Sequence, residues 1–126
     1  MEFNENKPIY LQIADQIMDD VEQSPQSGGE RIPSVRDYAA KSGVNANTVM
    51  RSYTWLQQEG IIYNQRGIGY FYSPDARKRV LEMRKRVFFD KEMKYFFNRL
   101  RAFDMGPSEI AKLYNEYLTD NKDFNR

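Results

Sequence analysis

The chain has 126 residues, of which 40% are hydrophobic and 29% charged, which suits about one domain with a modest core. It contains no cysteine and no histidine, which excludes disulfides, thiolate zinc sites and the commonest general base. No apolar run approaches the roughly 20 residues of a membrane-spanning helix, and the acidic first residues do not resemble a secretory signal. These features predict a cytoplasmic protein without metal or histidine chemistry.

The net charge of +1 conceals an uneven distribution of charges along the chain. Residues 1–30 carry one lysine against seven acidic side chains, and residues 31–79 carry eight basic against three acidic side chains. Residues 80–126 carry ten basic against eight acidic side chains. A polyanion would therefore dock on the basic middle segment, although surface lysines and arginines are in most proteins simply solvated.

The first predicted element is an amphipathic helix. Apolar residues recur at helical spacing over residues 9–21, while acidic residues occupy the other face. The pattern predicts a helix of about fifteen residues that begins after Pro8 and ends in a turn at residues 24–29. Residues 32–33 are expected to be extended, because the residue before a proline is pushed towards β geometry.

Two shorter helices are predicted next, joined by a tight turn. The first lies between an N-cap at Ser34 and a C-cap at Gly43. The second is capped by Asn45 or Asn47, and Gly60 terminates it. Two helices joined by a turn of three or four residues that contains glycine form a helix-turn-helix unit.

After residue 60 the hydrophobic pattern changes from helical to alternating, which predicts a β-hairpin over residues 61–72 with its turn at residues 66–69. Helical spacing resumes over residues 74–103, with a bend expected near Asp90. The pair Gly106-Pro107 stops this run and starts a last helix, whose polar end after residue 118 is expected to fray.

The predicted fold class is therefore mainly α with a small β-hairpin wing. Residues 1–73 form a winged helix-turn-helix domain in this interpretation. Residues 74–126 form a tail of two C-terminal helices.

Side chains at three tips of this fold, namely the N-terminal parts of the two short helices and the turn of the wing, are suited to binding duplex DNA. A helix fits the major groove, where asparagine can pair with adenine and arginine with guanine, and helix N-termini hold phosphates. Taken singly, each candidate has an ordinary explanation as a cap or a solvated side chain; the hypothesis depends on their combination. The candidates on the two helices and the wing are Ser34, Arg36, Asn45, Asn47, Thr48, Arg51, Gln65, Arg66 and Gly67.

The C-terminal tail holds more aromatic rings than two helices can bury against each other, and exposed apolar patches usually mark an interface. We expect a homodimer that matches a palindromic site with half-sites about one helical turn apart. The alternative is that the rings pack on the winged domain as ordinary core. The basic runs at 77–79 and 84–86 either contact phosphate or form a solvated helix face. The predicted dimerisation residues are Phe88, Phe89, Met93, Phe96, Phe97, Leu100 and Tyr114.

Five motifs occur in a characteristic order. They are Pro8-Ile9-Tyr10-Leu11-Gln12-Ile13, Ile32-Pro33-Ser34-Val35-Arg36-Asp37-Tyr38-Ala39, Gly43-Val44-Asn45-Ala46-Asn47-Thr48-Val49, Glu59-Gly60-Ile61-Ile62 and Arg66-Gly67-Ile68-Gly69. Together they resemble the GntR family of bacterial transcription regulators over about residues 8–72. The resemblance implies a winged DNA-binding domain. The residues that it implies as operator contacts are Arg36, Asn47, Thr48, Arg51, Arg66 and Gly67.

The tail is too short for the large effector or aminotransferase-like domains of most GntR subfamilies, and it resembles the dimerising tail of the YtrA-type subfamily. One departure is the segment 24–30, which replaces the family's usual Pro-Gly turn; we expect it to alter only that turn. The resemblance also suggests repression rather than activation.

Three other functions compete with this hypothesis. Acidic side chains at the tips of the recognition helix and the wing would indicate a winged-helix adaptor that binds protein and not DNA, but this sequence has Asn, Thr and Arg there. An enzyme is not expected, because no nucleophile–base arrangement, phosphate-binding Gly-Lys-Ser/Thr motif or carboxylate pair with a reason to be perturbed is present, and no cofactor is expected. A small-molecule effector bound between the tail helices stays open, since periodicity does not distinguish a cleft from a packed core.

Overall fold

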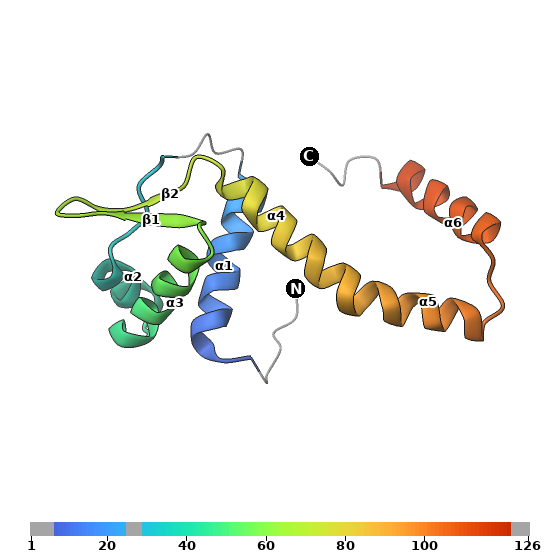
Figure 1. The fold of residues 1–126 in the computed structure, drawn as a ribbon, viewed down its shortest axis with the longest axis horizontal. Coiled ribbons are helices and arrows are strands. Elements are labelled where there is room, and N and C mark those ends of the chain that lie inside the picture. The colour runs from blue at the N-terminus through green and yellow to red at the C-terminus, as the bar shows by residue number, and fades with distance from the viewer. Residues whose placement is uncertain (1–6, 25–28, 122–126) are drawn as a thin grey trace. The chain divides into compact units, whose positions relative to one another are not determined.

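The computed structural model describes residues 7–24 and 29–121, and Figure 1 shows the order of their elements. The chain divides into two compact units, residues 1–84 and residues 85–126. Most of the turn predicted at residues 24–29 lies outside the described residues. The two units are taken in turn.

The first helix, α1 (Ile9–Gln23), begins after Pro8 and has the predicted length of 15 residues. Its buried face consists of Ile13, Ala14, Ile17, Met18 and Val21. The spacing of these residues by three and four is that of one helical stripe, so α1 forms one wall of the core.

The helix-turn-helix is present as predicted, with α2 (Val35–Ser42) and α3 (Ala46–Gln58). The Ser34 side chain accepts a 3.0 Å hydrogen bond from the backbone N–H of Asp37, which caps α2. Gly43 ends α2 with φ 73°, a left-handed conformation that favours glycine. The open choice between two caps for α3 is settled, because Asn45 is the N-cap.

The wing is an antiparallel hairpin of β1 (Ile62–Gln65) and β2 (Gly69–Tyr72). The predicted extended segment adds to its edge, since Arg31 forms a β-bridge with Phe71. The backbone N–H of Ile32 also donates to the Tyr70 carbonyl at 3.0 Å. The wing is thus attached to the residues that lead directly into α2.

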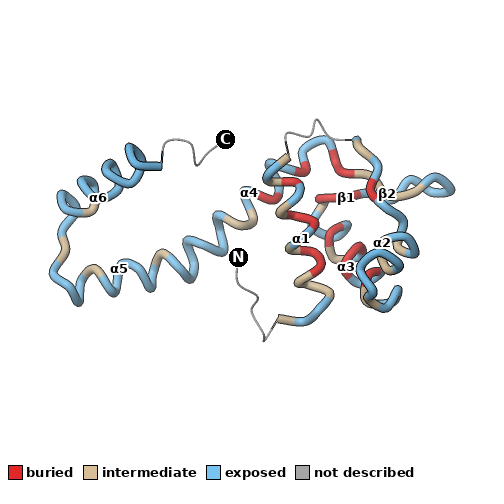
Figure 2. The backbone as a smooth tube through the Cα atoms, turned by 180° about the vertical axis from the view of Figure 1, so that it is seen from behind, coloured by how far each residue is buried: buried red, intermediate tan, exposed pale blue. Residues whose placement is uncertain are grey.

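The core of the first unit lies where α1, α3, β1 and the start of α4 (Ala76–Val87) meet, as the buried residues in Figure 2 show. Tyr53 and Leu56 of α3 and Val80 of α4 are fully buried there. The first turns of α4 therefore pack with the winged fold, beyond the domain boundary predicted after residue 73. Val35, Tyr38, Ala39 and Val44, around α2, are only partly buried against this core.

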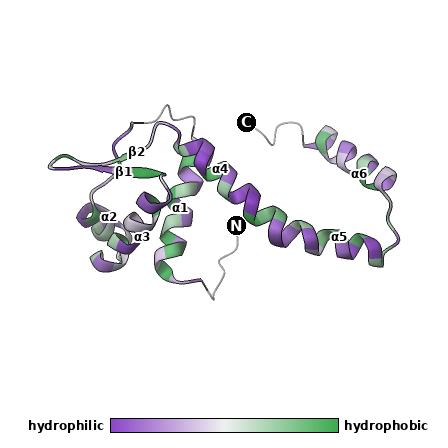
Figure 3. Cartoon of the chain, in the orientation of Figure 1, coloured by the Kyte–Doolittle hydropathy of each residue, from purple (hydrophilic) through white to green (hydrophobic). Residues whose placement is uncertain are grey.

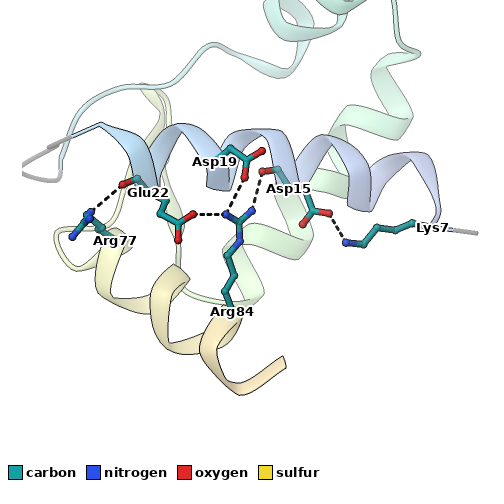
Figure 4. Close-up of polar contacts among 6 residues, drawn as sticks. All are labelled: Lys7, Asp15, Asp19, Glu22, Arg77 and Arg84. Carbon is teal, nitrogen blue, oxygen red and sulfur yellow. Dashed lines mark hydrogen bonds and ion pairs between the residues drawn. The ribbon is translucent and has the colours of Figure 1, made fainter. Parts of the chain in front are cut away.

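Ion pairs fasten α4 to α1 (Figure 4). The Arg84 guanidinium lies 2.9 Å from both the Asp19 and the Glu22 carboxylates, and it donates to the Asp15 carbonyl at 3.2 Å. Arg77 donates to the Glu22 carbonyl at 3.1 Å. The acidic face of α1 is thus partly neutralised by α4.

The second unit contains the π-helical turn η1 (Phe88–Glu92), α5 (Met93–Ala102) and α6 (Pro107–Asp120). The π-helical turn occupies the position at which a bend was expected. α5 ends at Ala102 with Phe103 as its C-cap, and Asp104 follows with φ 58°. Pro107 is the first residue of α6, as predicted. The fraying predicted from Thr119 is wrong for Thr119 and Asp120, which are helical.

None of the residues described between 85 and 121 is buried, and Figure 2 draws α5 and α6 almost wholly as exposed. Hydrophobic and hydrophilic residues alternate along both helices in Figure 3. Each helix therefore presents an apolar stripe for which this unit provides no core.

Candidate nucleic-acid interface

The N-terminus of α3 carries two of the predicted base-reading side chains in different states. The side-chain oxygen Oδ1 of Asn45 accepts a 2.7 Å hydrogen bond from the backbone N–H of Asn47, so Asn45 acts as a cap. The Asn47 side chain is exposed, and no hydrogen bond engages it within the described parts of the chain. Thr48, the next residue, is half-buried. Of these two asparagines, Asn47 is therefore the one whose side-chain amide is not engaged as a cap.

Arg51 lies one helical turn after Asn47 and is also exposed. Its guanidinium carbon lies 4.2 Å from the centre of the Tyr10 ring, a cation–π contact between α3 and the first turn of α1. A shallow cleft of about 260 Å³ adjoins this pair. The residues that line it are Tyr10, Met50, Arg51, Thr54, Trp55 and Gln58.

The N-terminus of α2 carries Ser34 and Arg36. Ser34 is engaged as the cap, and Arg36 is an exposed residue in the first turn. Across the described residues, no carboxylate pairs with Arg36. A guanidinium beside the positive end of a helix dipole is well placed to approach a phosphate.

The wing tip is a β-turn in which the backbone N–H of Ile68 donates to the Gln65 carbonyl at 2.9 Å. Gly67 occupies the third position of this turn with φ 80°, which non-glycine residues rarely adopt, and the space beside it is open. Gln65, Arg66 and Gly67 are all exposed. Glycine is thus required here by the backbone conformation, and it leaves Arg66 at the outermost position of the turn.

Arg31 is absent from the predicted set, although it shapes the wing. Its guanidinium donates to the Ile68 carbonyl, and it lies 3.0 Å from the position that a Cβ at Gly69 would occupy. The periodicity of hydrophobic residues does not reveal this contact, because Arg31 and Ile68 are 37 positions apart in the chain. The one hint in the sequence is a basic residue next to the extended pair at residues 32–33.

Met50 is also absent from the predicted set, yet 43% of it is exposed on α3. The Tyr70 hydroxyl of the wing lies 3.8 Å from its sulfur atom. The sequence did contain a signal for Met50, because it lies three residues after Asn47 and therefore on the same face of the helix. An apolar side chain at this point suits contact with a thymine methyl group.

Three tyrosines connect the elements that carry these side chains. The Tyr53 ring of α3 meets the rings of Tyr38 in α2 and Tyr70 in β2 edge to face, with centroids 6.2 and 5.0 Å apart. The Tyr53 hydroxyl donates to the Pro33 carbonyl at 2.6 Å. Burial, more than the neighbouring Tyr38, raises the pKa of Tyr53 well above its ordinary value of 10. The cluster therefore fixes both helices and the wing against one another.

Several arginines of the basic runs at 77–79 and 84–86 are engaged inside the protein. Arg79 pairs with Asp75 at 2.9 Å, and Arg77 and Arg84 bind groups on α1. These contacts favour a structural role for the three arginines over phosphate binding. The exposed candidates lie instead on α2, α3 and the wing, which Figure 1 shows at one end of the first unit.

Two further features, metal-binding groups and membrane-spanning helices, concern the part of the chain that the structure describes. No group of three or more acidic side chains there could hold a metal ion. No helix in the same residues is long and apolar enough to cross a bilayer.

A helix-turn-helix followed directly by a two-stranded wing, with amide and guanidinium groups at its tips, defines a winged helix-turn-helix DNA-binding transcription regulator. Residues 9–71 match the model of the bacterial regulatory proteins of the gntR family. The chain belongs to the GntR family.

Individual relatives agree with this assignment. The chain is 41% identical over 75 residues to the HTH-type regulator YhcF of Bacillus subtilis (strain 168), a match over 60% of this chain and 62% of YhcF. It is 37% identical to the repressor YtrA of the same organism over 60% of this chain and 58% of YtrA. The chain thus spans about three fifths of the length of these relatives.

A crystal structure of a GntR-family regulator from Bacteroides thetaiotaomicron matches over a larger share, 90% of this chain and 98% of that chain. The sequence identity is 44% and the TM-score is 0.79. The predicted family and fold class are confirmed. Because fold and relatives are those of transcription regulators, the prediction that the chain is not an enzyme is confirmed as well.

Proposed function

We propose that the chain is a sequence-specific repressor that binds a palindromic operator as a homodimer. In this proposal α3 enters the major groove, where Asn47, Thr48 and Arg51 read base edges. Arg36 and the N-terminus of α2 hold the phosphate backbone, and the wing residue Arg66 approaches the adjacent groove or backbone. Such a protein would act at the nucleoid.

The observation that carries the proposal is that polar side chains at the N-termini of α2 and α3 and at the wing turn are exposed and not engaged by other groups of the described residues. Asn45 satisfies the N-terminus of α3, so the Asn47 amide does not need to serve as a cap. Arg36 and Arg66 are exposed, and neither has an ion-pair partner among the described residues. Cations without a partner in the protein gain most when they replace the counterions of DNA phosphates.

The helical tail supports the homodimer. Phe97 is 53% exposed and Tyr114 is 61% exposed, so the chain alone leaves large rings in water. Burying apolar surface contributes about 25 cal/mol for each Å², which favours a second copy over solvent. Within the tail predicted over residues 74–126, we assign dimerisation to the second unit, residues 85–126, and its interface to the apolar stripes of η1, α5 and α6. The proposed contact residues are Phe88, Phe89, Met93, Phe96, Phe97, Leu100 and Tyr114.

Repression is supported by similarity to YtrA, whose name describes a transcriptional repressor and which is 37% identical in the matched segment. A dimer that covers a promoter site blocks access to it without any further surface. Repression is therefore the simplest mechanism for the proposed dimer.

A second candidate function is regulation by a small molecule bound to the tail. An apolar cleft of about 550 Å³ lies between α5 and α6, within the range of small-molecule sites. Its walls include Phe97, Leu100 and Ile110, and Arg101 and Tyr114 supply polar groups. Micromolar binding of a metabolite that also releases the operator would establish this function.

The DNA upstream of the gene is searched for an inverted repeat, and titration of labelled DNA that carries such a repeat, at several salt concentrations, tests the main proposal. Specific binding should weaken steeply as salt rises, because several phosphates are neutralised. A scrambled repeat should bind at least 10³-fold more weakly, on the order expected for specific regulators. Folded protein that binds neither DNA at low salt would favour the protein-binding adaptor instead.

A further inference from the structure

Tyr10, in the first turn of α1, contacts two consecutive residues of α3. Its ring contacts Arg51, and its backbone carbonyl contacts Ser52. The Tyr10 ring lies under the Arg51 guanidinium, 4.2 Å from ring centre to guanidinium carbon. The Tyr10 carbonyl oxygen accepts a 2.7 Å hydrogen bond from the Ser52 hydroxyl. Ser52 is fully buried, so this hydrogen bond fixes the Tyr10 backbone to the inner side of α3.

This arrangement makes Tyr10 the anchor of the Arg51 side chain. Within residues 7–24 and 29–121, Arg51 has no ion pair or hydrogen bond through its side chain, so the Tyr10 ring is its one ordering contact there. Arg51 is nevertheless exposed, and Tyr10 is half-buried. The ring thus supports the guanidinium from the side of α1 without removing it from the surface.

A cation–π contact orders arginine without using its hydrogen-bond donors when the guanidinium lies flat on the ring. A guanidinium rests on an aromatic ring through its flat face, whereas its five N–H groups point outward in its own plane. The donors are then free to pair with a base or a phosphate. A long side chain that is already ordered loses less rotamer entropy when it binds DNA, which raises affinity.

We propose that Tyr10 is a positioning residue for DNA recognition, which holds the Arg51 guanidinium ready to bind the operator. This inference rests on the proposed function, in which Arg51 contacts DNA. Tyr10 does not touch DNA in this scheme; it acts through Arg51. A ring is required at this position, and the tyrosine hydroxyl is not.

The contact at an exposed site predicts a measurable effect. Tyr10→Leu should weaken operator binding about two- to fivefold, the range that a surface cation–π contact supplies. Tyr10→Phe keeps the ring and should bind like the unmodified chain. Ile9→Ala, at an exposed neighbour in the same turn, is the matched control and should also bind normally.

A double-mutant cycle in the full chain separates positioning from general stabilisation. Operator affinity is measured by fluorescence anisotropy for Tyr10→Leu, Arg51→Ala and the double variant, with thermal melting of each to establish folding. The proposal expects the Tyr10→Leu effect to disappear in the Arg51→Ala background, because the group it positions is gone. If Tyr10→Leu does not melt cooperatively, Tyr10→Met takes its place.

Each other outcome overturns the inference in a distinguishable way. An equal Tyr10→Leu effect with and without Arg51 shows that Tyr10 acts elsewhere. Normal binding by Tyr10→Leu beside weak binding by Arg51→Ala removes the role of Tyr10 but leaves the proposed function intact. Normal binding by Arg51→Ala removes Arg51 from the DNA face, and the inference fails with that part of the proposed function. A loss in Tyr10→Phe as large as in Tyr10→Leu assigns the effect to the hydroxyl.

Discussion

At the scale of single residues, Asn47 and Arg66 represent two kinds of DNA contact. An amide on the recognition helix can satisfy both the donor and the acceptor on the major-groove edge of adenine, which no other base presents in that order. A guanidinium at a turn tip is attracted to phosphate, which is the same at every base pair. Substitutions at the two positions should therefore differ in kind and not only in size.

Replacement of Asn47 by alanine should reduce the discrimination between operator and scrambled DNA. We expect operator affinity to fall by about 1–3 kcal/mol, while binding to scrambled DNA is unchanged. Competition binding with both DNAs measures the ratio directly. Gln57→Ala, an exposed residue on the same helix, is the control. An equal loss on both DNAs would mean that Asn47 serves the backbone or the fold.

Replacement of Arg66 by alanine should instead weaken binding to every sequence by a similar factor. The slope of log affinity against log salt should become shallower by about 1, because one phosphate contact is lost. A salt series on operator and scrambled DNA checks this. The exposed Arg79, which is paired with Asp75, provides a control substitution that removes the same charge elsewhere. A loss confined to the operator would contradict the assignment.

The Tyr53 hydroxyl gives a prediction about alkaline stability. Tyr53→Phe removes the buried hydrogen bond to the Pro33 carbonyl, which should lower the free energy of unfolding by roughly 1–2 kcal/mol at neutral pH. Burial raises the pKa of Tyr53 in the folded chain, so the unfolded chain releases this proton first as pH rises above about 10. The unmodified chain therefore loses this contribution with rising pH, and the phenylalanine variant has none to lose.

Urea unfolding of both proteins at pH of about 8 and about 11 measures that difference. The stability gap between them should shrink at the higher pH. A constant gap would show that the Tyr53 hydroxyl does not titrate differently in the folded and unfolded chains.

At the scale of elements, the attachment of α4 to α1 depends on a partly buried cation. The Arg84 side chain is 25% exposed, and it faces Asp19 and Glu22 at 2.9 Å. Its removal leaves two neighbouring carboxylates without their counterion, which costs more than the loss of a fully solvated pair. The Arg79–Asp75 pair on the outside of α4 is about half exposed and represents that solvated case.

Arg84→Ala should accordingly lower the free energy of unfolding by roughly 1–2 kcal/mol, a value reduced for partial solvent screening. Arg79→Ala should change it by no more than about 0.5 kcal/mol. Urea denaturation of both variants under the same conditions makes the comparison. Equal effects would show that α4 is held by Ala76 and Val80 in the core and not by the ion pairs.

The elements that the sequence predicted best are those with local signals at both ends. Ser34 and Gly43 bound α2, and Asn45 begins α3, because capping depends on residues only a few positions apart. The contacts of Arg84 with α1 and of Arg31 with the wing join residues far apart in the chain. Neither leaves a periodic trace, so they became visible only in the structure.

At the predicted DNA-binding residues, too, features with local sequence signals were predicted and contacts between distant residues were not. Apart from the half-buried Thr48, the candidates on α2, α3 and the wing are exposed, and most of them lie next to a cap or a turn that has a local sequence signal. Whether Asn45 or Asn47 served as the cap required coordinates, since both precede the same apolar stripe. The stacking of Tyr10 on Arg51 required them too, since its partners are 41 positions apart.

At the scale of the whole molecule, a tail that joins two DNA-binding domains raises their combined affinity for DNA. A single small domain neutralises few phosphates and dissociates readily at physiological salt. When a second reader is linked to the first, its binding becomes intramolecular, and the gain can reach about 10²–10⁴ in affinity. In the proposed dimer, the exposed rings of the tail would therefore act on DNA binding through dimerisation, although we place none of them on DNA.

Phe97→Glu tests this link, because a charge in an apolar interface is costly to bury. Light scattering should show a monomer where the unmodified chain forms a dimer. Affinity for the complete inverted repeat should fall by about 10²–10⁴, while affinity for a single half-site should stay the same. Scrambling one half of the repeat should then cost the variant nothing. Asn98→Glu adds the same charge at the next, exposed position of α5 and should leave the dimer intact. A Phe97→Glu dimer, or a monomer that still distinguishes one half-site from two, would show that the readers are coupled through another surface.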